Sequence, residues 1–248
     1  MAASQHTHPK KVPLNLKWIP QKPNYYKLNT DGATSSETDA DEIGGVIRNH
    51  LGAWMVGFAG QVPHVHCITT ELHALIKGLS LALEMQLIPL EVETDAHEVI
   101  TLLDTDNSKY TNLICDCRHL LGMLHNLPVR HAYKEQNGIA DQLAKLGIRM
   151  QDQAMRQIFV KLPLFVSAQL QADQIGATTQ RLVSIQDSQQ AASHDRKTCF
   201  VSNRVANEVV ANTVLAIDRI ATTSISNNVF SASICTMVHE HQSPVRNF

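Results

Sequence analysis

The sequence is poor in aromatic and charged residues, and it lacks any long apolar run. Aromatic residues make up 5% of its 248 residues and charged residues 18%, below the roughly 25% usual in globular proteins. No apolar run approaches the ~20 residues needed to span a bilayer, so we expect no membrane-spanning helix. With a formal net charge of −2, the chain as a whole has no general attraction for nucleic acids or membranes.

Cysteines are few and irregularly spaced. The chain has five of them, and no secretory apolar segment follows Met1. Because disulfide frameworks belong to oxidising compartments, we expect an intracellular protein in a reducing compartment, the nucleus or the cytoplasm. Cys115 with Cys117 and His64 with His66 are too isolated to supply the four ligands of a zinc site, so no zinc site is predicted.

Charge and composition divide the chain into three parts. Residues 1–23 contain four lysines, four prolines and no acidic residue, which predicts an extended basic lead-in. Residues 24–150 contain nine basic and sixteen acidic residues, and their regular patterns predict the folded domain, with residue 172 as an alternative end. Residues 173–248 are rich in Gln, Ser, Thr and Asn, which predicts a poorly ordered extension with one candidate amphipathic helix over 204–222.

The spacing of apolar residues predicts the elements of the central part. Three strands come first, and their short links favour antiparallel pairing. Helices and strands then alternate. The strands are expected at 25–30, 43–48, 53–59, 87–94 and 129–134, and the helices at 70–86, 96–103, 112–124 and 139–150. This order predicts an α/β fold with a five-stranded mixed sheet flanked by helices.

Four acidic residues stand at the ends of these elements. Asp31 follows the first strand, and Glu71 lies at the start of the first helix. Asp95 ends the fourth strand, and Asp141 lies at the start of the last helix. Each has an ordinary explanation taken alone, an Asp-Gly turn for the first and a helix N-terminus for the others. Because all four fall at ends of elements around one sheet, we expect their carboxylates to lie together.

The helix that contains Glu71 carries a stripe of small and apolar residues. The stripe consists of Ala74, Leu75, Gly78 and Ala82, which suggests close packing against the sheet. Glycine inside a helix costs roughly 1 kcal/mol relative to alanine, so Gly78 is expected to permit this close approach. A carboxylate at the top of a buried stripe needs a cation or a hydrogen-bond donor.

A cluster of carboxylates predicts bound divalent cations. Clustered carboxylates repel one another and raise the pKa of their neighbours, and cations with oxygen ligands relieve this repulsion. Carboxylate and water ligands suit Mg²⁺ or Mn²⁺. Two such ions about 3.5–4 Å apart can activate water and stabilise the leaving oxygen of a phosphodiester. The four acidic residues therefore predict a site for two divalent cations, Mg²⁺ or Mn²⁺, of a kind that can act on a phosphodiester.

Four sequence motifs surround the acidic residues. They are KLNTDGA at 27–33 with GGVIRN at 44–49, TELHAL at 70–75, VETDA at 92–96 and KEQNGIADQLA at 134–144. In this order and spacing they resemble the RNase H-like domains of plant non-LTR retroelement reverse transcriptases. The segment WIP at 18–20 resembles the lead-in of that family, so the resemblance covers residues 18–150.

The resemblance implies an RNase H-type fold and endonucleolytic cleavage of the RNA strand of RNA–DNA hybrids. It implies 3′-hydroxyl and 5′-phosphate products, and recognition of the RNA strand by its 2′-hydroxyl groups. By position, Asp31 would bridge both cations, Glu71 and Asp95 would complete one site, and Asp141 would contribute to the other. The protein would then be a retroelement-derived nuclease that is now a separate protein.

Two features of many family members are missing from the sequence. The stretch 134–141 is too short for their histidine-bearing loop, and His131 lies in a predicted strand, so it is not assigned that role. The basic handle of some members has no counterpart, and the acidic excess predicts few phosphate contacts. A catalytically weak or inactive RNase H-like module that binds nucleic acid or a protein partner is therefore the alternative. A 3′–5′ exonuclease of the same fold is disfavoured by the polar stretch after Asp31.

Overall fold

The computed structural model describes residues 11–34, 40–64, 66–125, 127–147 and 157–184. The chain divides at residue 202 into two units, and all described residues belong to the first. The candidate helix at 204–222 lies outside the described residues. None of the helices described is long and apolar enough to cross a membrane.

A six-stranded mixed sheet forms the centre of the first unit. Three strands pair antiparallel, β2 (Tyr26–Ala33), β3 (Ala40–Asn49) and β4 (Trp54–Pro63). Two further strands run parallel to β2, namely β5 (Leu90–Thr94) and β6 (Val129–His131). The short strand β7 (Gln157–Phe159) pairs antiparallel with β4, which gives the order β6-β5-β2-β3-β4-β7. The predicted mixed sheet is confirmed, and β7 adds a sixth strand whose three residues are too few to show a pattern.

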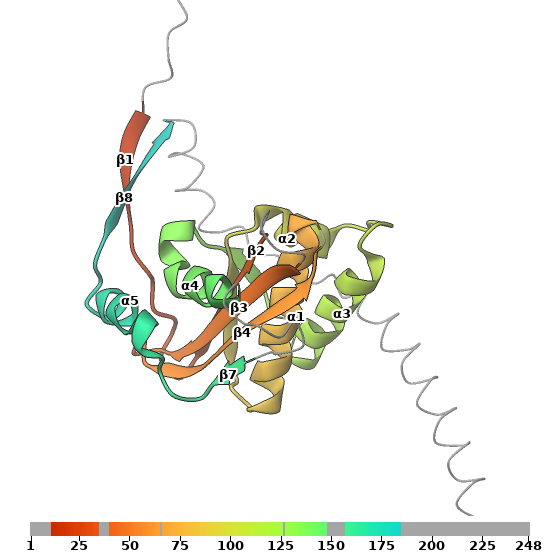
Figure 1. Cartoon of the computed structure of the whole chain (residues 1–248), viewed down its shortest axis with the longest axis horizontal. Helices are drawn as coiled ribbons and strands as arrows, with labels where there is room; N and C mark the ends of the chain where they lie inside the picture. Colours follow the sequence, from red (N-terminus) through yellow and green to blue (C-terminus); the bar gives the residue numbers. More distant parts are fainter. Residues whose placement is uncertain (1–10, 35–39, 65, 126, 148–156, 185–248) are drawn as a thin grey trace, which may run out of the picture. The chain divides into compact units, whose positions relative to one another are not determined.

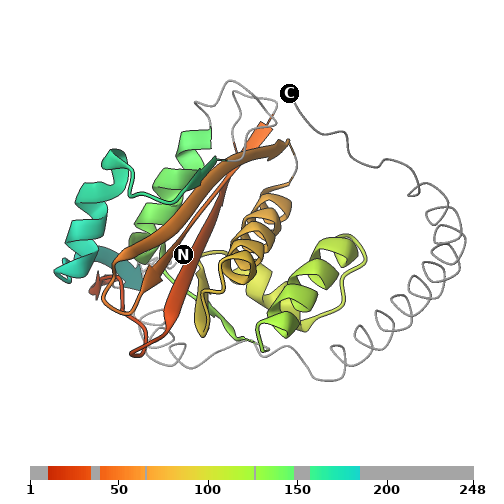
Figure 2. The same cartoon turned by 90° about the horizontal axis from the view of Figure 1, so that it is seen from below.

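Helices cover both faces of this sheet. Figure 2 shows α1 and α3 on one face and α4 and α5 on the other. The helices are α1 (Cys67–Glu84), α2 (His97–Asp104), α3 (Thr111–Met123), α4 (Gly138–Leu146) and α5 (Leu164–Gln174). A single 3₁₀ turn, η1 (Lys134–Gln136), leads into α4. The first four helices lie where the sequence predicted them, whereas α5 was not predicted.

Glycines bring α1 and α4 into direct contact with the sheet. A Cβ atom on Gly78 of α1 would lie 2.7 Å from Leu28 Cδ1 of β2, which confirms the predicted close approach. A Cβ atom on Gly44 of β3 would lie 2.1 Å from the backbone nitrogen of Ala144 in α4. The two helices that carry Glu71 and Asp141 are therefore held closely against β2 and β3.

A separate two-stranded ribbon joins the first and last described segments (Figure 1). In this ribbon β1 (Lys11–Leu16) pairs antiparallel with β8 (Thr179–Ser184). The structure thus differs from the expectation of an unpacked lead-in over 1–23 and an extension from 173. The two strands lie at opposite ends of the described chain, so a local pattern could not show their pairing.

Buried polar contacts fasten the lead-in and α5 to the sheet. The indole of Trp18 is 3% exposed, and the guanidinium of Arg48 lies 4.0 Å from its ring centroid. Arg48 also forms an ion pair of 2.6 Å with Asp173 of α5 and donates a hydrogen bond of 2.7 Å to Asn29 of β2. The folded unit therefore includes segments on both sides of the predicted domain.

Candidate metal centre

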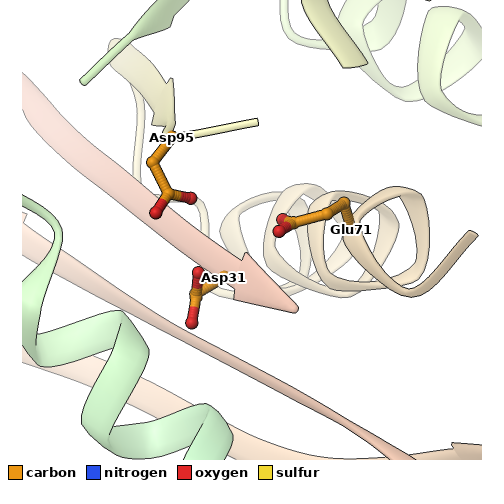
Figure 3. A group of neighbouring side chains, drawn as sticks. All are labelled: Asp31, Glu71 and Asp95. Atoms are coloured by element: carbon orange, nitrogen blue, oxygen red, sulfur yellow. The ribbon is translucent and has the colours of Figure 1, made fainter. Parts of the chain in front are cut away.

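Three carboxylates converge at one edge of the central sheet. Asp31 lies near the end of β2, Asp95 follows β5 directly, and Glu71 lies in α1. Their nearest oxygen atoms all lie within 4.8 Å of one another. Figure 3 shows the three side chains directed toward a common space. Within the described residues, this is the one group of three or more acidic, histidine or cysteine side chains arranged closely enough to hold a metal ion.

The strand register and a glycine explain this convergence. Thr30 of β2 pairs with Thr94 of the parallel strand β5, so the next residue of each strand, Asp31 and Asp95, emerges at the same edge. A Cβ atom on Gly32 would lie 2.8 Å from the backbone nitrogen of Glu71. Glycine at this position therefore allows α1 to place Glu71 beside the other two carboxylates.

Burial and mutual repulsion perturb two of these carboxyl groups. Burial, followed by the charges of Asp95 and Asp141, raises the pKa of Asp31 from 3.8 to about 8. Burial, followed by the charges of Asp31 and Asp95, raises the pKa of Glu71 from 4.5 to about 9, although a backbone hydrogen bond from Gly32 opposes this rise. The Oε2 atom of Glu71 is buried without a hydrogen-bond partner, so a cation would satisfy it.

Asn137 connects α4 to the carboxylates. It occupies the N-cap position of α4, but its side chain makes no capping hydrogen bond. Its amide nitrogen instead donates a hydrogen bond of 2.8 Å to the carbonyl oxygen of Thr30 and lies 3.5 Å from Asp95 Oδ1. Its position inside the last sequence motif was the only signal that could have found this role.

Asp141 lies beside the cluster, where two lysines engage it. Its Oδ1 atom lies 3.2 Å from Lys134 Nζ, and its Oδ2 atom lies 2.6 Å from Lys145 Nζ. The hydrogen bond and charge of Asp141 raise the pKa of Lys134, while the charge of Asp141 helps to raise that of Asp31. The structure thus groups three of the four predicted residues and places the fourth nearby. The sequence analysis missed Lys134, for which, as for Asn137, its position inside the last sequence motif was the only signal.

Comparison with known proteins finds sequences that are similar to this α/β domain with its acidic cluster. Residues 29–147 match the family described as reverse transcriptase-like. The Arabidopsis thaliana protein named "Putative ribonuclease H protein At1g65750" is 28% identical over 173 residues, which cover 68% of this chain and 28% of that protein. The chain therefore spans less than a third of the length of the curated relative that it matches.

Solved structures that are similar to part of this chain include ribonucleases H. RNase H1 from the archaeon Halobacterium salinarum NRC-1 has a TM-score of 0.47 and 21% identity, and the match covers 50% of this chain and 98% of that one. LC11-RNase H1 in complex with an RNA/DNA hybrid has a TM-score of 0.46 and 20% identity, over 50% and 96% of the two chains.

The chain contains an RNase H-like domain. The family match includes Asp31, Glu71, Asp95 and Asp141, and the mixed sheet with helices on both faces is the fold that the sequence motifs led us to expect. The acidic cluster in this domain could bind a divalent metal ion.

Proposed function

We propose that this domain cuts the RNA strand of RNA–DNA hybrids endonucleolytically, with two Mg²⁺ ions held by Asp31, Glu71, Asp95 and Asp141. The observation that carries the proposal is the group of three carboxylates within 4.8 Å of one another. Oxygen-only ligands suit Mg²⁺ or Mn²⁺, and the unpartnered oxygen of Glu71 fits a cation. The choice of substrate is supported by the names of the relatives, a ribonuclease H protein and an RNase H1 in complex with an RNA/DNA hybrid.

The protein's own side chains define how the site would work. Bound divalent cations would supply the positive charge that activates water and stabilises the leaving oxygen of a phosphodiester. Asp31 is central because the charges of Asp95 and Asp141 both raise the pKa of its carboxyl group. The backbone of Gly32 holds Glu71 in place, and Asn137 fixes the start of α4 relative to β2. These contacts hold the ligands in position before substrate binds.

Cleavage of a labelled RNA–DNA hybrid with Mg²⁺ or Mn²⁺ tests the proposal. We expect the wild type to cut the RNA strand alone and Asp31→Asn to lose this activity. Asp116→Asn, the same change on the exposed face of α3, should cut like the wild type. If the folded wild type cuts nothing with either metal, the nuclease proposal is wrong.

A catalytically weak module that binds nucleic acid is the second candidate. The engagement of Asp141 by Lys134 and Lys145 favours it, because these ammonium groups compete with a cation for the same oxygens. This candidate requires that the folded protein bind the hybrid without cutting it. Binding and cleavage assays on the same labelled hybrid therefore separate the two functions.

A further inference from the structure

Four side chains form a row that leads from the carboxylate cluster to β8. We define His97, His131, Tyr133 and Arg181 as the stacking row. The ring centroids of His97 and His131 are 5.8 Å apart, and those of His131 and Tyr133 are 5.3 Å apart. The guanidinium carbon of Arg181 lies 5.4 Å from the centroid of the Tyr133 ring. Three planar rings and one planar cation are therefore neighbours on one surface.

The row begins directly beside Asp95. His97 follows Asp95 by two positions at the start of α2. His131 pairs across β5 and β6 with Thr94, the residue that precedes Asp95. A strand of nucleic acid that passes the carboxylates can therefore continue along these rings.

The members of the row are accessible, and one of them, Arg181, is a cation. His97 and His131 are exposed, Tyr133 is half-buried, and the side chain of Arg181 is 43% exposed. Glu135 holds the guanidinium of Arg181 through an ion pair of 3.1 Å. Arg181 lies in β8 of the β1–β8 ribbon, beyond residues 29–147, the part that matches the family.

We propose that the stacking row binds an unpaired segment of the RNA strand where that strand leaves the hybrid beside the carboxylate cluster. The inference rests on the proposed function, which places the RNA strand at the cluster. Imidazole, phenol and guanidinium planes stack on bases of any sequence, and Arg181 can also contact a phosphate group. The row would then favour hybrids that carry a single-stranded RNA tail.

Binding of three labelled hybrids by fluorescence anisotropy in EDTA, where no cutting occurs, tests this proposal. One hybrid is blunt, and each of the other two carries a short RNA tail at one of the two ends of the RNA strand. We expect the wild type to bind one tailed hybrid roughly fivefold or more tightly than the blunt one, as expected for one stacked base. Tyr133→Leu and Arg181→Gln should lose this gain, whereas Tyr133→Phe, which retains the ring, should keep it.

A matched control and one further variant exclude a purely structural role. Lys22 and Tyr25, just before β2, form a similar pair outside the stacking row, with Lys22 Nζ 5.9 Å from the centroid of the Tyr25 ring. Tyr25→Leu should therefore leave the gain unchanged. Glu135→Gln releases Arg181 from its ion pair and should preserve or increase the gain. If Arg181 only anchors β8, Glu135→Gln will instead lose the gain as Arg181→Gln does, and the proposal is wrong.

Failure of this inference can be told apart from failure of the proposed function. Equal affinity of the wild type for the blunt hybrid and for both tailed hybrids overturns the stacking row, even if the blunt hybrid is cut with Mg²⁺. Tighter binding of a tailed hybrid that depends on Tyr133 and Arg181 supports the role of the stacking row, even if none of the hybrids is cut.

Discussion

Two buried carboxyl groups should make the stability of the metal-free domain depend on pH. The pKa values of about 8 for Asp31 and about 9 for Glu71 lie above their ordinary values of 3.8 and 4.5. The folded state therefore binds more protons than the unfolded state in this range, so stability falls as pH rises from about 4 toward 8–9. We expect a lower Tm in EDTA at pH 8 than at pH 6, and a larger increase in Tm on adding Mg²⁺ at pH 8.

The variant Asp31→Asn isolates the contribution of the cluster to this pH dependence. It removes one repelling charge, so the Tm in EDTA at pH 8 should rise and the difference between pH 6 and pH 8 should shrink. Asp116→Asn should retain the wild-type pH dependence. An unchanged difference between the two pH values in Asp31→Asn would contradict the electrostatic account.

Lys134 should compete with a cation for Asp141. Lys134→Gln removes the ammonium group 3.2 Å from Asp141 Oδ1, so we expect Mn²⁺ to bind up to about fivefold more tightly, the effect of one partly exposed ion pair. Titration calorimetry measures this change. Lys161→Gln, at an exposed lysine before α5, is the matched control. Weaker binding of Mn²⁺ to Lys134→Gln would instead mean that this lysine supports the metal site.

At the scale of residues, the sequence predicted acidic ligands better than their supporting contacts. Asp31, Glu71 and Asp95 could be predicted to meet because each stands near the end of an element around one sheet. The contact from Asn137 to Thr30 spans 107 positions, and the lysine pair on Asp141 depends on side-chain conformations. Neither leaves a periodic pattern in the sequence.

Close contact between α4 and β3 should make Gly44 intolerant of any side chain. In Gly44→Ala the new Cβ would meet the backbone of Ala144 at 2.1 Å, which side-chain movement cannot relieve. We expect a loss of about 3 kcal/mol or more in the free energy of unfolding, at or beyond the upper end for overpacked sites. Urea denaturation measures it.

Gly138→Ala provides the control for this substitution. Its Cβ would lie 3.4 Å from the side chain of Gln169, an ordinary contact, and alanine is the better helix former. The midpoint of urea denaturation should stay close to that of the wild type. Equal losses in Gly138→Ala and Gly44→Ala would show that the spacing of α4 from β3 does not decide stability.

At the scale of elements, the sequence predicted those with a strong local pattern. The apolar residues of β2, β3, β4 and α1 and the turns between them predicted these elements, and the structure confirms them. The helix α5 buries only Val166, Leu170 and Asp173, too few for a clear apolar stripe. The strands β1 and β8 depend on one another across most of the chain, so neither could be predicted from its own residues.

The whole folded unit should need the segments that flank the family match. Val166 and Leu170 of α5 complete a core cluster with Val46, Ile139 and Leu143. Removal of α5 also leaves the fully buried Arg48 without Asp173. Breaking such a buried pair costs about 3–5 kcal/mol, a large part of the 5–15 kcal/mol typical of a whole domain.

We therefore expect residues 24–150 alone to unfold without a cooperative transition, and residues 11–184 to retain one. Circular dichroism during urea denaturation distinguishes the two fragments. Asp173→Ala in the full chain should lower the midpoint, whereas Gln174→Ala next to it, on an exposed side chain, should change it little. A cooperative transition of 24–150 with the same midpoint as 11–184 would contradict this prediction.

Pairing of β1 with β8 places Lys11 opposite Ser184, so the polypeptide enters and leaves this unit at neighbouring points. Units with adjacent ends tolerate insertion into other proteins and circular permutation. A host protein could therefore accept this unit within one surface loop without its own loop ends being forced apart.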